Sequence, residues 1–143
     1  MARKRFRDFP IVDGNGKLLG LISRRRLLNV RKKQVILVDH NEKSQAVDGV
    51  EEAEVMEIID HHRIGSLQTM APVYFRNQPV GCTATILYQV YQEKNLTIEP
   101  NIAGLLCSAI LSDTLMFRSP TCTAMDKAAA EKLAEIAGVK CEE

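Results

Sequence analysis

All three histidines of this chain lie beside aspartates at points where apolar runs end, and a further aspartate ends a third apolar run. The residues concerned are Asp39, His40, Asp60, His61, His62 and Asp113. Carboxylates and imidazoles without thiolates suit Mn²⁺, Fe²⁺ or Zn²⁺, and the large share of oxygen ligands favours Mn²⁺. The residue types and their positions therefore predict a divalent metal site.

The chemistry that such a site supports is hydrolysis at phosphorus. Two hard divalent ions that share a carboxylate can activate a water molecule at neutral pH for in-line attack, and a nearby histidine can stabilise the charge on the phosphoryl oxygens. A single aspartate at a strand end is more often a cap or turn residue, and a single histidine is more often a core or surface group. Because the three motifs together hold every histidine in the chain, we predict metal-dependent hydrolysis.

Alternating strands and helices are predicted to position these motifs, which makes this part of the chain an α/β unit. The predicted strands are residues 35–38, 55–59 and 71–75, and the predicted helices are residues 83–93, about 100–112 and 124–137. The first strand is continuously apolar, so we expect both of its faces to be buried in a parallel sheet. The middle helix is apolar nearly all round and is expected to be buried. Thr123 and Gly138 are the predicted start and stop of the last helix.

Charge separates the first 33 residues from the rest of the chain. Residues 1–33 carry eleven Lys and Arg against two acids, whereas residues 34–143 carry eight against sixteen. This asymmetry predicts two units with different origins or partners. The first unit contains two short apolar runs around an Asp-Gly-Asn-Gly turn, which predict a hairpin, and Ser23 is a predicted N-cap for a short helix that reaches about Val30. One hairpin and one helix bury too little surface to be stable alone.

The segment FPIVDGNGKLLGLISRRRLL in this first unit resembles the last strand, strand and helix of a cystathionine-beta-synthase (CBS) domain. The resemblance implies that the parent protein binds adenine nucleotides, through a Ser or Thr followed three residues later by Asp. Ser23 matches the first position, but Arg26 stands at the second. The basic residues here can instead contact phosphates, although a solvated helix face with a linker is favoured. No aromatic residues alternate with them, so we expect no nucleic-acid partner.

The second unit resembles the DHH phosphoesterase superfamily through the motifs VILVDHNE, IIDHHRIG, GCTATI and SDT, in this order. It is most similar to the manganese-dependent (family II) inorganic pyrophosphatases, in the subgroup that carries CBS domains. The spacings of 22 residues from Asp39 to His61 and of 52 residues from His61 to Asp113 fit that subfamily. The resemblance implies a partial parallel-sheet DHH domain with flanking helices at residues 34–143, preceded by a CBS remnant and linker at residues 1–33.

The resemblance also implies a role for each matching residue. Asp39 would bridge two metal ions, and His61 and Asp113 would complete the ligands of one of them. His62 would be the catalytic residue that faces the substrate phosphate. Asp60 would orient an imidazole from behind, as the histidine ligands of metals require. The implied metal is Mn²⁺ or Co²⁺, with Mg²⁺ as an option alongside the substrate.

The function that the resemblance implies is hydrolysis of pyrophosphate to two phosphates by a cytoplasmic parent enzyme, expected to be a homodimer without a membrane segment. One alternative is a DHH phosphoesterase acting on an oligonucleotide, polyphosphate or a cyclic dinucleotide. A second alternative is a non-catalytic, CBS-linked fragment with a regulatory or assembly role. Asn41 has no firm role, because an asparagine after a strand can equally hold a turn.

Two features of the pyrophosphatase family are not found in this sequence. One is a His-x-x-x-Asp-x-Asp motif at the end of a first strand, and the other is a C-terminal lobe with Arg and Lys residues for pyrophosphate. We therefore expect an internal fragment with an incomplete active site, inactive alone. The four cysteines lack the spacing of a zinc site and are expected to be reduced thiols, with Cys107 in the core.

Overall fold

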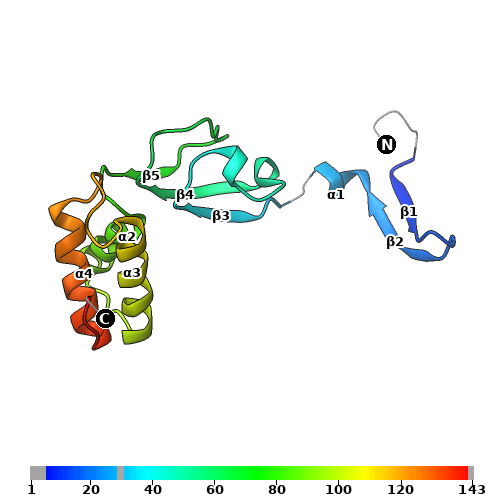
Figure 1. Ribbon diagram of the computed structural model, residues 1–143. Helices are drawn as coiled ribbons and strands as arrows, with labels where there is room; N and C mark the ends of the chain where they lie inside the picture. Colours follow the sequence, from blue (N-terminus) through cyan, green and yellow to red (C-terminus); the bar gives the residue numbers. More distant parts are fainter. Residues whose placement is uncertain (1–5, 29–30, 142–143) are drawn as a thin grey trace. The chain divides into compact units, whose positions relative to one another are not determined.

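The computed structural model describes residues 6–28 and 31–141 (Figure 1). The chain divides into two compact units, Met1–Lys33 and Gln34–Glu143. None of the helices in the described ranges combines the length and hydropathy that a bilayer crossing requires. The motifs with aspartate and histidine all lie in the second unit.

The first unit is a two-stranded hairpin followed by one short helix. Strands β1 (Asp8–Val12) and β2 (Leu18–Ser23) pair antiparallel, and α1 (Arg24–Leu28) follows directly. Asp13 holds the turn because its Oδ1 accepts hydrogen bonds from the backbone N–H groups of Asn15 and Lys17. None of the described residues of this unit is buried, as expected for an element without a core of its own. Its likeness to a CBS domain stays a prediction, and the expected end of the helix at Val30 lies outside the described residues.

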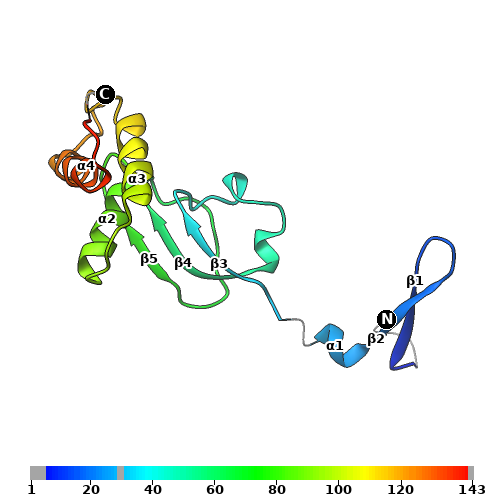
Figure 2. The ribbon, with the colours of Figure 1, turned by 90° about the horizontal axis from the view of Figure 1, so that it is seen from below.

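A parallel three-stranded sheet forms the centre of the second unit. Its strands are β3 (Gln34–Val38), β4 (Glu54–Asp60) and β5 (Tyr74–Asn77), in the order β3-β4-β5. Because β4 lies between two partners, its last residues Ile58, Ile59 and Asp60 are all buried. Figure 2 shows the three strands side by side, with the helices of this unit at the end to which the strands point.

Two expectations about these strands were wrong. Ile36 and Val38 are 56% and 40% exposed, because β3 is the edge strand of the described sheet and only the face that carries Leu37 is covered. The third strand begins at Tyr74 rather than at residue 71. Pro72 lacks a backbone N–H, so the residues around it are poorly suited to a ladder of hydrogen bonds.

Three helices follow the sheet: α2 (Thr83–Glu93), α3 (Pro100–Asp113) and α4 (Ala124–Ala137). Short 3-10 turns at Lys43–Gln45 and Val50–Glu52 fill the connection between β3 and β4. Ile86 of α2 packs on Ile59 of β4 and so attaches the helices to the sheet. As predicted, Thr123 caps α4, and Gly138 ends it with a left-handed φ of 71°.

The core between the helices is narrower than the sequence predicts. On α3 only Ala103, Cys107 and Ile110 are buried, whereas Leu105 is 68% exposed. The prediction that α3 is buried all round was therefore wrong, because in the described structure α3 packs against α2 and α4 on one side only. The prediction that Cys107 lies in the core is confirmed.

Candidate metal centre

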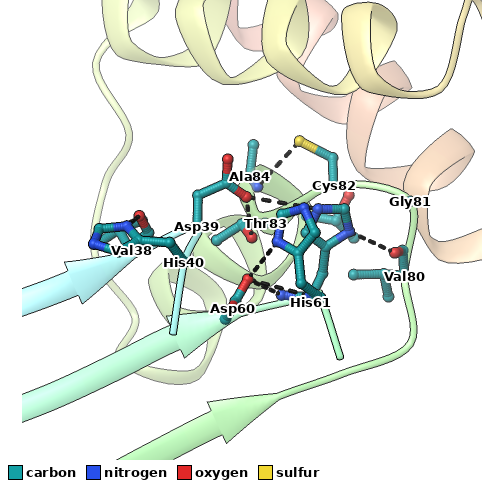
Figure 3. Close-up of polar contacts among 12 residues, drawn as sticks. Val38, Asp39, His40, Asp60, His61, Val80, Gly81, Cys82, Thr83 and Ala84 are labelled. Carbon is teal, nitrogen blue, oxygen red and sulfur yellow. Dashed lines mark hydrogen bonds and ion pairs between the residues drawn. The ribbon is translucent and has the colours of Figure 1, made fainter. Parts of the chain in front are cut away.

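The candidate site lies where β3 and β4 end. The two strands are parallel, and beyond a register shift between Val35 and Ile36 their ends pair with Val38 opposite Ile59. The residues that follow the two strands therefore meet at one edge of the sheet. Asp39 extends the ladder, because its backbone N–H donates to the carbonyl of Ile59 at 2.9 Å. Its φ of 67° is left-handed, an uncommon conformation for a residue with a side chain. The Asp39 carboxylate then points towards His61 and Thr83 (Figure 3).

Asp39, His61 and His62 form a cluster in which one potential ligand atom of each lies within 4.8 Å of the others. His61 Nε2 and Asp39 Oδ1 are 3.6 Å apart, too far for a good hydrogen bond. Two ligands that each lie about 2.1 Å from one divalent ion are about 3 Å or more apart. The distance between His61 Nε2 and Asp39 Oδ1 therefore suits two ligands of one metal ion better than a hydrogen bond between the two side chains.

The tautomer of His61 follows from its neighbour Val80. His61 Nδ1 lies 2.9 Å from the Val80 carbonyl oxygen, which can only accept, so Nδ1 carries the proton and donates. His61 Nε2 is thereby left with a lone pair on the side of Asp39, as a metal ligand requires. Thr83 supports the other partner, since its Oγ1 donates to Asp39 Oδ1 at 2.8 Å.

Asp60 lies beneath this cluster and is fully buried. Its Oδ1 accepts hydrogen bonds from the backbone N–H groups of His61 and His62, at 2.8 and 3.2 Å, and from His62 Nδ1 at 2.8 Å. Burial alone would raise the pKa of Asp60, but the hydrogen bonds from His62, Asn41 and His61 prevail and lower it. A charged Asp60 thus fixes the loop and leaves His62 Nε2 free to face a ligand.

Asn41 has a structural task that the sequence did not reveal. Its side chain is buried and donates to the Asp60 carboxylate and, at 3.0 Å, to the carbonyl of Arg63. Its Oδ1 accepts from the backbone N–H of Gly65. Asn41 therefore ties the end of β3 to the loop that carries both histidines. A polar residue after a predicted strand was the available signal, but it does not distinguish this role from a turn.

Gly65 is expected not to tolerate even a methyl group. A Cβ at this position would overlap Glu42 Cγ and lie 2.7 Å from Asn41 Oδ1. We predict that Gly65→Ala lowers the free energy of unfolding by about 1–3 kcal/mol, as overpacking does, measured by urea unfolding. Gly104→Ala is the matched control, because its Cβ would meet only Ala137 Cβ at 3.7 Å. Equal effects of the two changes would contradict the prediction.

Asp113 and His40 lie outside the cluster. Asp113 ends α3 and lies beside the Cys82 thiol. Burial raises the pKa of Cys82 to about 12, and the carboxylates of Asp113 and Asp39 contribute to this rise. Cys82 therefore lies near two of the expected ligand carboxylates. His40 Nδ1 instead contacts the carbonyl of Val38 at 3.0 Å, on the other side of Asp39 from His61 (Figure 3). The described structure brings Asp39, His61 and His62 together, with Asp113 close by.

The parallel sheet with aspartates and histidines at its carboxyl edge defines an α/β protein with a candidate metal site. Comparison with known proteins identifies the family. The model of the DHH family, N-terminal domain, matches residues 3–110, and the chain belongs to the DHH family. The resemblance seen in the motifs is thereby confirmed.

Relatives with established names have closely similar sequences. The chain is 51% identical over 139 residues to the cobalt-dependent inorganic pyrophosphatase of Clostridium perfringens, which covers 97% of this chain and 25% of that protein. It is 61% identical over 109 residues to the manganese-dependent inorganic pyrophosphatase of Bacillus subtilis, a match that covers 76% of this chain and 35% of that protein. The chain thus spans only about a quarter to a third of the length of these relatives.

The fold is also similar to that of a solved structure. A candidate family II inorganic pyrophosphatase from Methanococcus jannaschii superposes with a TM-score of 0.73 at 48% sequence identity. The match covers 77% of this chain and 38% of that one. The predicted parallel-sheet DHH domain with flanking helices is confirmed.

Proposed function

We propose that this chain is the metal-binding segment of an inorganic pyrophosphatase that hydrolyses pyrophosphate to two phosphates. The observation that carries the proposal is the cluster of Asp39, His61 and His62, in a chain 51–61% identical to relatives named as metal-dependent inorganic pyrophosphatases. The relatives reported above are named for pyrophosphate hydrolysis, so the alternatives drawn from the sequence are not favoured.

Mn²⁺ or Co²⁺ is the proposed cofactor. The donor set fits such an ion, because the lone pair of His61 Nε2 and the Asp39 carboxylate face the same point at the strand ends. The relatives are named as manganese-dependent and cobalt-dependent. Bound there, the ion would polarise a phosphoryl oxygen and lower the pKa of water. Mg²⁺ would accompany the substrate.

Each residue of the site has a proposed part in the reaction. Asp39, His61 and Asp113 would hold the divalent metal, with Asp39 as the ligand common to two ions. His62, with both ring nitrogens protonated, would donate from Nε2 to a phosphoryl oxygen and stabilise the charge that develops there. Asp60 accepts the His62 Nδ1 hydrogen bond at 2.8 Å and so sets the direction of the ring.

The first unit is proposed to be part of a regulatory CBS domain that takes an adenine nucleotide in the whole protein. A match of 139 residues to the Clostridium protein has to include most of residues 1–33. That relative is also longer than the Bacillus protein, since 139 residues are 25% of the former and 109 residues are 35% of the latter. The whole enzyme is proposed to be cytoplasmic and to form a homodimer. Light scattering on the full-length protein would test the dimer.

A chimera tests the proposed reaction directly. In the Bacillus subtilis relative, the matched segment of 109 residues would be replaced by the corresponding residues of this chain. With Mn²⁺, we expect phosphate release from pyrophosphate and no cleavage of a dinucleotide. His62→Gln in the chimera is expected to lower kcat by about 10²–10³-fold, the usual effect of removing a group that stabilises developing charge. A folded chimera that prefers the dinucleotide, or releases no phosphate, would contradict the proposal.

A further inference from the structure

Asp126 is a buried carboxylate that none of the site residues contacts directly. It lies in the first turn of α4 and is 0% exposed. Its Oδ2 accepts from the backbone N–H and the hydroxyl of Thr123, at 2.7 and 2.6 Å, which forms the cap of the helix. Capping alone would involve only these neighbours. The same carboxylate also accepts from Gly81 N at 2.8 Å and from Thr85 Oγ1 at 2.6 Å, both outside α4.

The segment 80–83 that Asp126 contacts is the segment that supports two of the proposed ligands. The carbonyl of Val80 accepts the His61 Nδ1 hydrogen bond, and the hydroxyl of Thr83 donates to Asp39. Both groups belong to residues within two positions of Gly81. Displacement of the Gly81 backbone would therefore move the partner of His61 and the partner of Asp39 together (Figure 3).

Gly81 is packed closely against residues of two other elements. A Cβ on Gly81 would lie 2.8 Å from Thr114 Cγ2 and 3.0 Å from Asp126 Oδ2. Thr114 is fully buried and follows Asp113, the last residue of α3. The backbone at Gly81 thus touches the end of α3 and the start of α4, and its N–H is held by one carboxylate.

We propose that Asp126 is a positioning residue for the metal site and acts through the backbone of segment 80–83. Its carboxylate stays charged because hydrogen bonds from Thr123, Thr85 and Gly81 outweigh the effect of burial and lower its pKa. By accepting from Gly81 N, it fixes the Val80 carbonyl that selects the His61 tautomer. The inference rests on the proposed function in one respect, because it takes Asp39 and His61 as metal ligands.

Three variants of the 143-residue chain separate positioning from helix capping. Asp126→Ala removes the acceptor for Gly81 N. Asp126→Asn is the conservative variant. Its side-chain oxygen can take the Oδ2 position and accept from Gly81 N. Its NH₂ group can then donate to the Thr85 hydroxyl, which is also an acceptor. Thr123→Ala removes the cap hydroxyl but leaves the contact between Asp126 and Gly81. The readouts are Mn²⁺ affinity by calorimetry and the position of the ring proton of His61, from the ¹⁵N shifts of its imidazole.

We expect Asp126→Ala to weaken Mn²⁺ binding by about 10–100-fold, the range found when a group that orients a metal ligand is lost. The His61 proton would then be shared between both ring nitrogens. Asp126→Asn and Thr123→Ala are expected to stay within about threefold of the unaltered chain and to keep the proton on Nδ1. If Thr123→Ala and Asp126→Ala act alike, Asp126 only caps α4 and the inference is wrong. If the unaltered chain binds no Mn²⁺, the proposal that this segment holds the metal by itself fails, while the position of the His61 proton still decides the role of Asp126.

Discussion

Replacing His61 with alanine is expected to weaken Mn²⁺ binding by the 143-residue chain by more than about 100-fold. Loss of a group that merely orients a ligand weakens metal binding by about 10–100-fold, so loss of a ligand itself has to exceed that range. The imidazole supplies the lone pair 3.6 Å from Asp39 Oδ1, and its Nδ1 contact with the Val80 carbonyl holds that lone pair towards Asp39. Calorimetry with Mn²⁺ and then with Co²⁺ measures the effect.

His40→Ala is the matched control for this experiment. It removes the same side chain from the residue next to Asp39, but the His40 ring binds the Val38 carbonyl and lies outside the cluster. Its Mn²⁺ affinity is expected to stay within about threefold of the unaltered chain. A result in which both variants bind Mn²⁺ like the unaltered chain would show that His61 is not a ligand. Asp113→Asn, measured in parallel, tests whether the end of α3 also contributes.

The sequence predicts most of the elements of the second unit because their signals are local. Thr123 and Gly138 delimit α4 through contacts within a few residues of each helix end, and the apolar runs define β3 and β4. Burial is different, because it depends on which neighbours a segment meets. The apolar character of Ile36 and Leu105 predicts a core position, yet both are more than half exposed in the described structure.

The same distinction applies to the site. Asp39 and His61 stand out because of their residue types and because parallel strands bring their ends together. Asn41, Thr83 and Asp126 act through contacts with residues 19 to 45 positions away. A lone polar residue in a sequence does not show which distant donor it will meet. These supporting residues therefore emerge only from the folded arrangement.

Asp60→Ala is expected to be among the most destabilising single changes in the second unit. The carboxylate is 0% exposed and accepts from two backbone N–H groups, His62 Nδ1 and Asn41 Nδ2. Removing one partner of a buried charged network leaves these donors unpaired, which costs about 3–5 kcal/mol. Urea unfolding followed by circular dichroism measures the change. Asp48→Ala removes an exposed carboxylate and is expected to change the free energy of unfolding by less than about 0.5 kcal/mol.

The pH dependence of stability gives a second and independent test of Asp60. Its pKa is lowered in the folded chain by hydrogen bonds from His62, Asn41 and His61, which overcome the opposing effect of burial. The resulting stabilisation is fully present above the unfolded pKa of about 4 and is lost as the pH falls through the folded pKa. Asp126 has a pKa shifted in the same direction, so both groups favour unfolding in acid. In Asp60→Asn this position no longer titrates, and the loss of unfolding free energy below about pH 4 is expected to be shallower than in the unaltered chain. An equal slope in both proteins would mean that the charge of Asp60 does not hold the loop of His61 and His62 in place.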